Sequence, residues 1–293
     1  MIKATVMIST KDRPGDLNNV LKRLRKLDNY KDIEIIVTDD GSRQNIERLF
    51  EKSYPEVIFR RSDVSFNYVR HRNNMFRMAK GDYVFSIDDD AWYEQSDSIE
   101  KAIEIFKRNP KAGILNFRVN LPDRGTISEN KSAGRPFAVA EFIGCAHAIR
   151  KSCFNEGEDL YDELYLRQGE ERDLAIKCLD KGYDILQVNN IVVFHNYQGK
   201  NRDHQSIHTY AFRNELFFYL KYFPGLRCPA FLVKCFLSHT RFCFGKMWFR
   251  AFFAGIYGFF RFFLLELRKR KPIKQKTVRR YLRLLKESQG AGR

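Results

Sequence analysis

Short apolar runs alternate with longer amphipathic stretches through the first two hundred residues. The runs predict strands over residues 3–9, 33–38, 57–59, 83–87 and 112–119. Between them, apolar residues recur every three or four positions, which is typical of helices. These helices are predicted around residues 17–27, 67–80 and 99–106, the second of them ended by Gly81. Alternating strands and helices favour an α/β fold whose parallel sheet is covered on both faces.

The pattern continues beyond residue 120 with less regularity. Residues 121–137 are polar and contain Gly and Pro, which indicates a loop. Residues 139–150 look like a strand, and residues 170–181 form a helix that Gly182 ends. Two last strands are predicted over residues 183–188 and 191–194.

Charge and aromatic content change abruptly near residues 196–210. The chain carries a net charge of +16, yet from Lys200 onward 21 Lys and Arg face 4 Asp and Glu. Twenty aromatic residues lie between Tyr210 and Phe263. The first 199 residues are therefore close to neutral, and a basic, aromatic extension is predicted to follow them.

The six cysteines and the first residues both favour a cytosolic protein. The cysteines contain no CxxC pair and no zinc-ligand spacing, so we expect free thiols of a cytosolic protein. Residues 1–6 already read as a strand, and no signal peptide is expected.

Three adjacent aspartates, Asp88, Asp89 and Asp90, follow the apolar run 83–87. Ligands of open α/β sheets bind at the carboxyl ends of strands, and carboxylates there suit hard cations such as Mg²⁺ or Mn²⁺. The alternative is a cap for the helix that follows, but a cap needs only one carboxylate.

A second acidic pair, Asp39 and Asp40, ends the run 33–38 and is followed by Gly41 and Ser42. This sequence is also common in ordinary turns. Together the two strand ends predict one site for a metal ion and a phosphorylated ligand.

The ordered series of motifs resembles the family 2 inverting glycosyltransferases, which use nucleotide-diphospho-sugars. It runs from Ser9-Thr10-Lys11-Asp12-Arg13-Pro14 through the two aspartate motifs and Arg72-Asn73 to Gly169-Glu170-Glu171-Arg172-Asp173-Leu174 and His195. The extension is loosely similar to bacterial members that decorate cell-surface polysaccharides. The resemblance implies a GT-A-like, Rossmann-related mixed central sheet flanked by helices. It covers residues 1–200 as the catalytic domain, with a nucleotide half to about 110 and an acceptor half from about 111.

Roles in donor binding follow from the resemblance. Asp90 is expected to bind the metal directly, with Asp88 facing the ribose or the metal's water shell. Asp89 either contacts the donor sugar or is structural. Asp39 would accept a hydrogen bond from a uracil or thymine base, and Asp40 would support its loop. Residues that would contact the base, ribose or diphosphate are Thr10, Arg13, Arg72, Lys200 and Arg202.

Roles at the acceptor are assigned in the same way. Glu171 is the expected base that takes the acceptor proton, and Glu170 is the substitute because the family more often has Asp after Glu here. Asp173 either orients the acceptor or caps the helix. Trp92 is either a sugar-stacking or a core aromatic residue. His195 is either a metal ligand or a structural histidine, and Arg72 is alternatively a solvated helix-face arginine.

The expected function is transfer of a hexosyl or deoxyhexosyl group from a UDP- or dTDP-sugar to a hydroxyl of a glycan or lipid-linked acceptor. The aromatic run 252–260 is too short to cross a bilayer. Residues 225–293 are instead expected to lie on an anionic membrane, with the protein peripheral on the inner face of the plasma membrane. Alternatively, residues 201–293 pack on the core or on a second subunit, as in a homodimer.

Competing functions explain less of the sequence. A nucleotidylyltransferase needs a Gly-rich loop after the first strand, which Ser9 to Pro14 is not, and a glycosidase does not explain three aspartates. A catalytically inactive scaffold and a nucleic-acid-binding tail are the remaining alternatives, although no nucleic-acid module is recognisable and no nucleic acid is expected as a partner.

Overall fold

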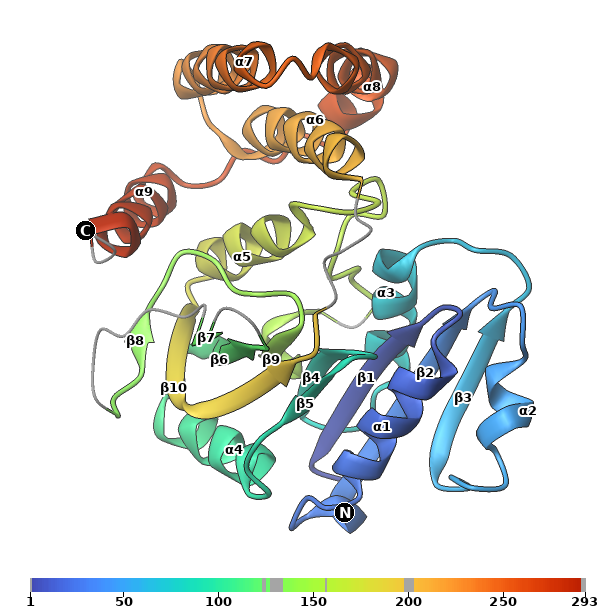
Figure 1. The fold of residues 1–293 in the computed structure, drawn as a ribbon. Coiled ribbons are helices and arrows are strands. Elements are labelled where there is room, and N and C mark those ends of the chain that lie inside the picture. Colours follow the sequence, from blue (N-terminus) through green and yellow to red (C-terminus); the bar gives the residue numbers. More distant parts are fainter. Residues whose placement is uncertain (1, 123–124, 127–133, 156, 198–202, 291–293) are drawn as a thin grey trace.

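A mixed sheet forms the centre of the protein, whose computed structural model describes residues 2–122, 125–126, 134–155, 157–197 and 203–290. Eight of its ten described strands lie in the order β3-β2-β1-β4-β9-β6-β10-β5, with β7 beside β6 and β8 beside β10 (Figure 1). The strands are β1 (Ala4–Thr10), β2 (Ile33–Asp40), β3 (Val57–Ser62), β4 (Tyr83–Asp88), β5 (Ala91–Tyr93), β6 (Ala112–Leu121), β7 (Gly125–Thr126), β8 (Phe137–Ala138), β9 (Ala146–Arg150) and β10 (Asp184–His195).

The first four strands in this order are parallel, and their register sets the position of the acidic residues. Thr10 of β1 lies opposite Asp39 of β2, and Ser9 lies opposite Asp88 of β4. The prediction of a wholly parallel sheet is wrong beyond this point, because β9 runs antiparallel to both β4 and β6. The mixed sheet agrees with the expectation from the resemblance.

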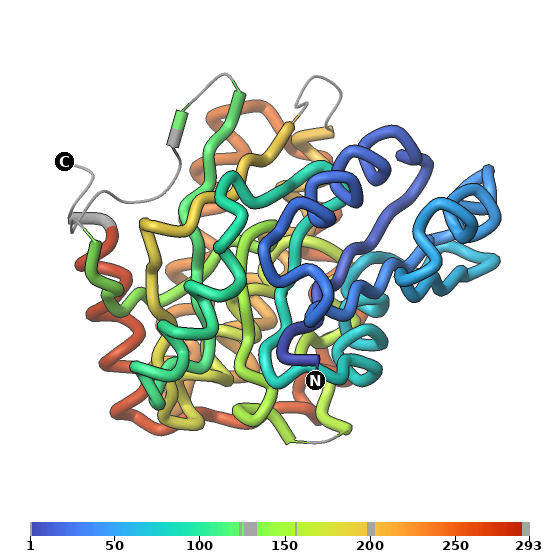
Figure 2. The backbone as a smooth tube through the Cα atoms, turned by 90° about the horizontal axis from the view of Figure 1, so that it is seen from below, coloured from blue at the N-terminus to red at the C-terminus, as the bar shows by residue number. Residues whose placement is uncertain are grey.

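Helices cover both faces of the sheet because alternate strand residues point to opposite sides. Val6 and Ile8 of β1 belong to one apolar core and Met7 to the other. The helices on the first core are α1 (Pro14–Leu24), α2 (Ile46–Phe50) and α4 (Ser98–Arg108), and those on the second are α3 (Tyr68–Met78) and α5 (Glu170–Asp180). Seen from below, the N-terminal strands lie to one side and the segment from β6 to β10 lies to the other (Figure 2).

Four further helices make up the described part of the C-terminal extension. They are α6 (His204–Tyr222), α7 (Arg227–Gly245), α8 (Phe249–Arg268) and α9 (Gln275–Gly290). Helices α7 and α8 lie over α6, while α9 returns beside α5 (Figure 1). Apolar residues of α6 share the second core with α5, and the predicted domain division near residue 200 stays a prediction. Among the described helices, none has both the length and the apolarity needed to cross a bilayer.

Some local predictions are wrong. Residues 139–150 do not form one strand: β9 begins only at Ala146, and the preceding apolar residues pack as irregular chain beside the second core. The two last predicted strands are one strand, β10, with a register shift between Val188 and Val192. The short elements α2 and β5 were not predicted, since five and three residues are too few to show a period.

Candidate active site

The three aspartates lie at the carboxyl end of β4, where β1 and β10 also end. Strand β10 runs antiparallel to β5, which places His195 opposite Ala91, directly after Asp90. The backbone of Asn196 strengthens this pairing with a hydrogen bond of 2.9 Å to the carbonyl of Asp90. The fold therefore brings His195 to the aspartates from more than one hundred residues away.

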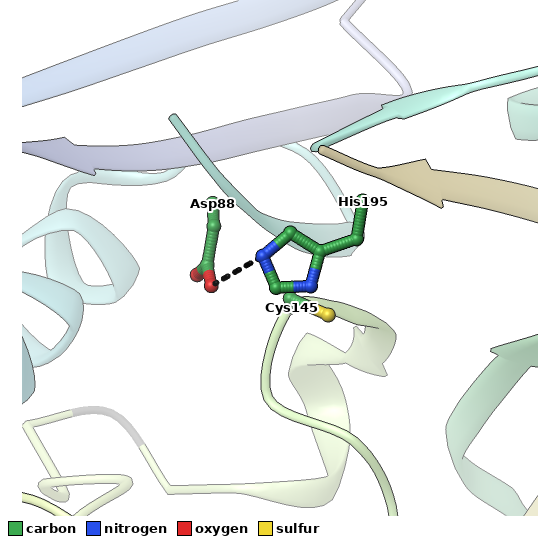
Figure 3. A group of neighbouring side chains, drawn as sticks. All are labelled: Asp88, Cys145 and His195. Carbon is green, nitrogen blue, oxygen red and sulfur yellow. Dashed lines mark ion pairs between the residues drawn. The ribbon is translucent and has the colours of Figure 1, made fainter. Parts of the chain in front are cut away.

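Asp88, Asp90 and His195 form a compact group, of which Figure 3 shows Asp88 and His195 beside Cys145. His195 Nε2 lies 3.1 Å from Asp90 Oδ1 and 4.0 Å from Asp88 Oδ2. Cys145 joins them, since its Sγ and the ligand atoms of Asp88 and His195 lie within 4.8 Å of one another. Burial raises the pKa of the Cys145 thiol well above its usual value, and the charge of Asp88 adds to this. A neutral thiol is a poor ligand for a hard cation, so the two carboxylates and the imidazole are the groups here that could hold one.

Arg13 and Thr10 hold the inner aspartates in place. Asp89 is 5% exposed and accepts hydrogen bonds from the Thr10 hydroxyl and from Arg13, both at 2.7 Å. Arg13 also donates to Asp90 at 2.8 Å. Burial raises the pKa of Asp89 to about 7 although Arg13 opposes the shift, whereas His195 and Arg13 overcome burial and lower the pKa of Asp90. These contacts favour the structural alternative for Asp89.

Arg72 of α3 closes the opposite side of this group. It donates to Asp88 Oδ1 at 3.0 Å and to the Gly144 carbonyl at 3.2 Å, and its guanidinium lies 4.9 Å from the centre of the Tyr68 ring. The alternative of a solvated arginine is wrong, because the residue is only 6% exposed. Charged Arg72 thus faces the cavity beside the aspartates.

Glu170 and Glu171 begin α5 across the cavity from β4. Glu170 is buried and accepts a hydrogen bond from the Tyr68 hydroxyl. Burial raises the pKa of Glu171 well above its usual value, as does the neighbouring charge of Glu170, while Arg72 opposes the shift. A carboxyl whose pKa moves toward neutrality is suited to accept a proton during a reaction.

A cavity of about 520 Å³ opens over these groups. Its lining residues are Ser9, Arg13, Tyr68, Arg72, Asp88, Asp89, Asp90, Leu121, Ile143, Gly144, Cys145, Arg167, Gln168, Glu170, Glu171, His195 and Tyr197. A smaller cavity of about 230 Å³ lies toward α6 and shares Gln168 and Glu171 with the first. The structure therefore gathers most of the predicted site residues around one space, with Glu171 where the two cavities meet.

Four predicted residues are absent from the described lining of that cavity: Thr10, which donates to Asp89 behind it, and Asp39, Trp92 and Asp173. Asp39 is buried and accepts hydrogen bonds from the Ser42 backbone at 2.9 Å and from Arg61 at 2.6 Å, so that its contact with a base stays a prediction. Trp92 is 9% exposed, stacks on Phe194 and favours the core alternative.

Asp173 points into a buried ionic cluster. Its carboxylate accepts a hydrogen bond from the Tyr222 hydroxyl and lies 2.6 Å from Lys177 Nζ. The structure gives it neither an acceptor-facing position nor a side-chain cap, which corrects the prediction. Lys200 and Arg202 lie outside the described residues.

Sequence reasoning missed several cavity residues. Tyr68, Gly144, Cys145 and Gln168 all line the space, and the first anchors Glu170. Gly144 permits the approach of Glu171, since a Cβ there would overlap Glu171 Oε1 and lie 3.5 Å from an Arg72 nitrogen. Gly144 and Cys145 escape the sequence-based prediction because residues 139–150 read as one regular strand, and Tyr68 and Gln168 belong to none of the motifs that indicate the site.

Comparisons with known proteins show what the chain is similar to. GalNAc(5)-diNAcBac-PP-undecaprenol beta-1,3-glucosyltransferase of Campylobacter jejuni is 22% identical over 181 residues, which make up 56% of this chain and 57% of that relative. The chain thus matches little more than half of that relative's length.

Solved structures show the fold. Residues 1–349 of S. aureus TarS give a TM-score of 0.64 at 14% identity, covering 87% of this chain and 80% of that one, and TarS 1–349 has also been solved with UDP-GlcNAc. The mannosyltransferase PcManGT from Pyrobaculum calidifontis, solved with GDP-Man and Mn²⁺, gives 0.58 at 14% identity, covering 87% and 73%. The predicted GT-A type fold is confirmed. The model of glycosyl transferase family 2 matches residues 5–155, more than half of the sequence, and the chain belongs to this family.

Proposed function

We propose that this protein is an inverting, metal-dependent glycosyltransferase. It would move a sugar from a UDP- or dTDP-sugar to a hydroxyl of a glycan or lipid-linked acceptor in the synthesis of cell-surface polysaccharide. The observation that carries the proposal is the group of Asp88, Asp90 and His195, which faces Glu171 across one cavity. Charge-stabilising groups and a base on opposite sides of a space are what a single displacement needs.

The residues present fit a divalent cation. Asp90 Oδ1 and His195 Nε2 converge at 3.1 Å, and the side chain of Asp88 is 38% exposed toward the same space. Carboxylate oxygens with one imidazole suit Mn²⁺ or Mg²⁺. When bound there, the cation would stabilise the negative charge of the departing diphosphate as a Lewis acid. Asp89, held by Thr10 and Arg13, keeps the end of β4 in the required position.

Two arginine side chains supply positive charge for binding the donor diphosphate. Arg13 and Arg72 lie on opposite sides of the aspartates, and both line the cavity. A guanidinium binds phosphate oxygens through two parallel hydrogen bonds, which also orients the donor. Lys200 and Arg202 would close over the diphosphate, and Asp39 would contact the base.

Glu171 is the proposed base. The acceptor oxygen attacks the anomeric carbon, the bond from that carbon to the diphosphate oxygen breaks, and the hydroxyl proton passes to the Glu171 carboxylate. Attack from the face opposite the leaving group inverts the anomeric centre. Glu171 lines both cavities at their meeting point, whereas Glu170 is engaged by Tyr68.

The extension is proposed to bind an anionic membrane surface, which would make the protein peripheral on the inner face of the plasma membrane. Large apolar side chains are exposed along α7 and α8; the most exposed are Val233, Leu237, Phe253, Tyr257, Phe260 and Leu264, at 59–69%. Basic residues such as Arg250 and Arg261 lie among them. Apolar and cationic side chains on the same helices are typical of interfacial binding.

Nucleotide release from a panel of UDP- and dTDP-sugars, with Mn²⁺ or Mg²⁺ and without metal, tests the chemistry. We expect Asp90→Ala and Glu171→Gln to lower turnover by about 10²–10⁴-fold. The matched control Glu104→Gln, on the exposed side of α4, should keep it. Full turnover in both active-site variants would refute the assignment.

Sedimentation with vesicles tests the membrane contact. The protein should bind strongly to vesicles of anionic lipid and weakly to vesicles of zwitterionic lipid. Phe260→Ser combined with Leu264→Ser should weaken binding, whereas Leu49→Ser, an equally apolar exposed position on α2, should not. Equal binding by all three proteins would count against the assignment of α8.

A further inference from the structure

A second group of metal-ligating side chains lies between α6 and α7, outside the lining of the first cavity. Glu215 of α6 faces Cys235 and His239 of α7, which are four residues apart and therefore share one side of their helix. His208 lies two turns before Glu215 on α6. Helix α6 runs directly beneath α7 in the fold (Figure 1). The proposed glycosyl transfer does not use this group.

The ligand atoms of three of these residues converge. His239 Nε2 lies 2.9 Å from Glu215 Oε2, and these atoms and Cys235 Sγ all lie within 4.8 Å of one another. Ligands of a tetrahedral zinc ion with bonds of about 2.0–2.3 Å lie roughly 3.3–3.8 Å apart. Side-chain movements of about 1 Å would bring the three atoms to that geometry.

The remaining atoms of these side chains have partners of their own. Glu215 Oε1 accepts a hydrogen bond from the Tyr219 hydroxyl at 3.0 Å and lies 3.3 Å from Arg172. His239 Nδ1 lies 3.1 Å from His208 Nε2. Outer partners of this kind fix the orientation of ligating carboxylates and imidazoles. Glu215 Oε1 and His239 Nδ1 thus hold their side chains in place, and Glu215 Oε2 and His239 Nε2 remain to face the ion.

We propose that Glu215, Cys235 and His239 bind one Zn²⁺ ion and that His208 orients His239. A thiolate, an imidazole and a carboxylate are zinc ligands, and the sulfur disfavours Mg²⁺ and Mn²⁺. Binding releases the Cys235 proton, and the resulting charges of thiolate and carboxylate balance the ion. Because the ligands come from two helices, the ion joins α7 to α6 and fixes the apolar surface of the extension relative to the catalytic core.

The test uses full-length protein in which Cys145→Ser removes the cysteine of the first cavity. Metal-free protein is titrated with Co²⁺, whose thiolate complexes absorb in the near ultraviolet, and then with Zn²⁺ in competition with a chelator. We expect cobalt bound at this site to give a thiolate band, which zinc then displaces. Cobalt held by the carboxylates and imidazole of the first cavity adds no such band in the Cys145→Ser protein. His208→Ala should weaken zinc binding by about 10–100-fold, as loss of an outer partner does.

Matched variants separate this site from other cysteines. Cys235→Ser should abolish the thiolate band, and Cys243→Ser, which changes another buried cysteine of α7, should leave it intact. Absence of the band from the Cys145→Ser protein itself would overturn the proposal without further variants. Equal loss of the thiolate band in Cys235→Ser and in Cys243→Ser would also overturn the proposal.

Discussion

The charged residues at the tip of β4 and those around Lys221 of α6 show two ways of keeping carboxylates out of bulk water. At the tip of β4, Asp88 pairs with Arg72 yet keeps a side chain that is 38% exposed toward the cavity. Around Lys221, Asp173 and Glu266 are fully buried, and the ammonium lies 3.5 Å and 3.4 Å from them. The first arrangement leaves carboxylate oxygens open to the cavity, whereas in the second the carboxylates are paired with ammonium groups of the same chain.

The electrostatics of the second group are those of a structural network. Although burial opposes the shift, Asp173 and Asp162 raise the pKa of Lys221, and Lys221 in turn lowers the pKa of Asp162 against the effect of burial. Lys269 adds a second ammonium, 3.2 Å from Asp162 and from Glu266. These contacts join α6 and α8 to the loop before α5. An acidic residue therefore indicates a reaction site only where one of its oxygens faces open space.

Breaking the buried network gives the largest expected effect. Lys221→Met removes the ammonium and leaves three buried carboxylates short of a partner. We expect the free energy of unfolding to fall by about 3–5 kcal/mol, as for other broken buried ion pairs. Urea denaturation measures it, and Lys107→Met on the exposed side of α4 should change it by less than about 0.5 kcal/mol. A Lys221→Met protein as stable as the parent would show that the network is not structural.

Disturbing the open site should instead cost activity. A methyl group at Gly144 meets the flexible end of Glu171, which can swing away without unfolding the protein. Displacement of a catalytic group by about 1 Å costs on the order of 100-fold in rate. We therefore expect Gly144→Ala to lower kcat/KM by about 100-fold with little loss of stability, while Gly245→Ala, which has open space around it, retains activity. Steady-state kinetics and thermal unfolding of the same samples decide between the two effects.

The same comparison explains what the sequence predicts and what it does not. Apolar periodicity predicts β1, β2 and β4. Because parallel strands end at one edge of the sheet, Thr10 and Arg13 at the end of β1 reach the aspartates at the end of β4. The position of His195 depends on the antiparallel pairing of three-residue β5, which has no periodic signal.

The role of Asp173 depends on a contact that local sequence does not contain. Glu170, Glu171 and Asp173 are all acidic residues in the first turn of α5. Which of them faces the cavity depends on the side of α5 that Lys221 covers, 48 residues further along the chain. Local pattern therefore predicts the helix, and the roles of its two glutamates stay predictions. It leaves Asp173 either orienting the acceptor or capping the helix, whereas the structure places it in the buried cluster.

Replacement of Asp173 tests that correction. Asp173→Asn removes the charge beside Lys177 and Lys221 and should lower the free energy of unfolding by about 1–3 kcal/mol, as for buried hydrogen bonds to charged groups. The KM for the acceptor should not change. A raised acceptor KM at unchanged stability would return Asp173 to the active site.

The smallest expected effect is a pH dependence with opposite sign in the two regions. Glu171 has a raised pKa in the folded protein, so its contribution to stability is complete below about pH 4.5 and is lost as the pH rises through the folded value. Glu171→Gln should therefore stabilise the protein by about 1 kcal/mol at pH 7, while lowering turnover by about 10²–10⁴-fold. That gain should vanish below the ordinary glutamate pKa of 4.5.

Asp162 should show the opposite dependence of stability on pH. Its pKa is lowered in the folded protein, so its contribution is present above its ordinary value of 3.8 and is lost only as the pH falls through the folded value. Asp162→Asn should then destabilise the protein at pH 7, with a difference that shrinks in acid. Thermal unfolding from pH 3 to pH 8 measures both variants beside Glu104→Gln. If Glu171→Gln and Asp162→Asn change the stability of the protein in the same direction at pH 7, the two regions hold their carboxylates in the same way. The distinction between a cavity-facing and a structural cluster is then wrong.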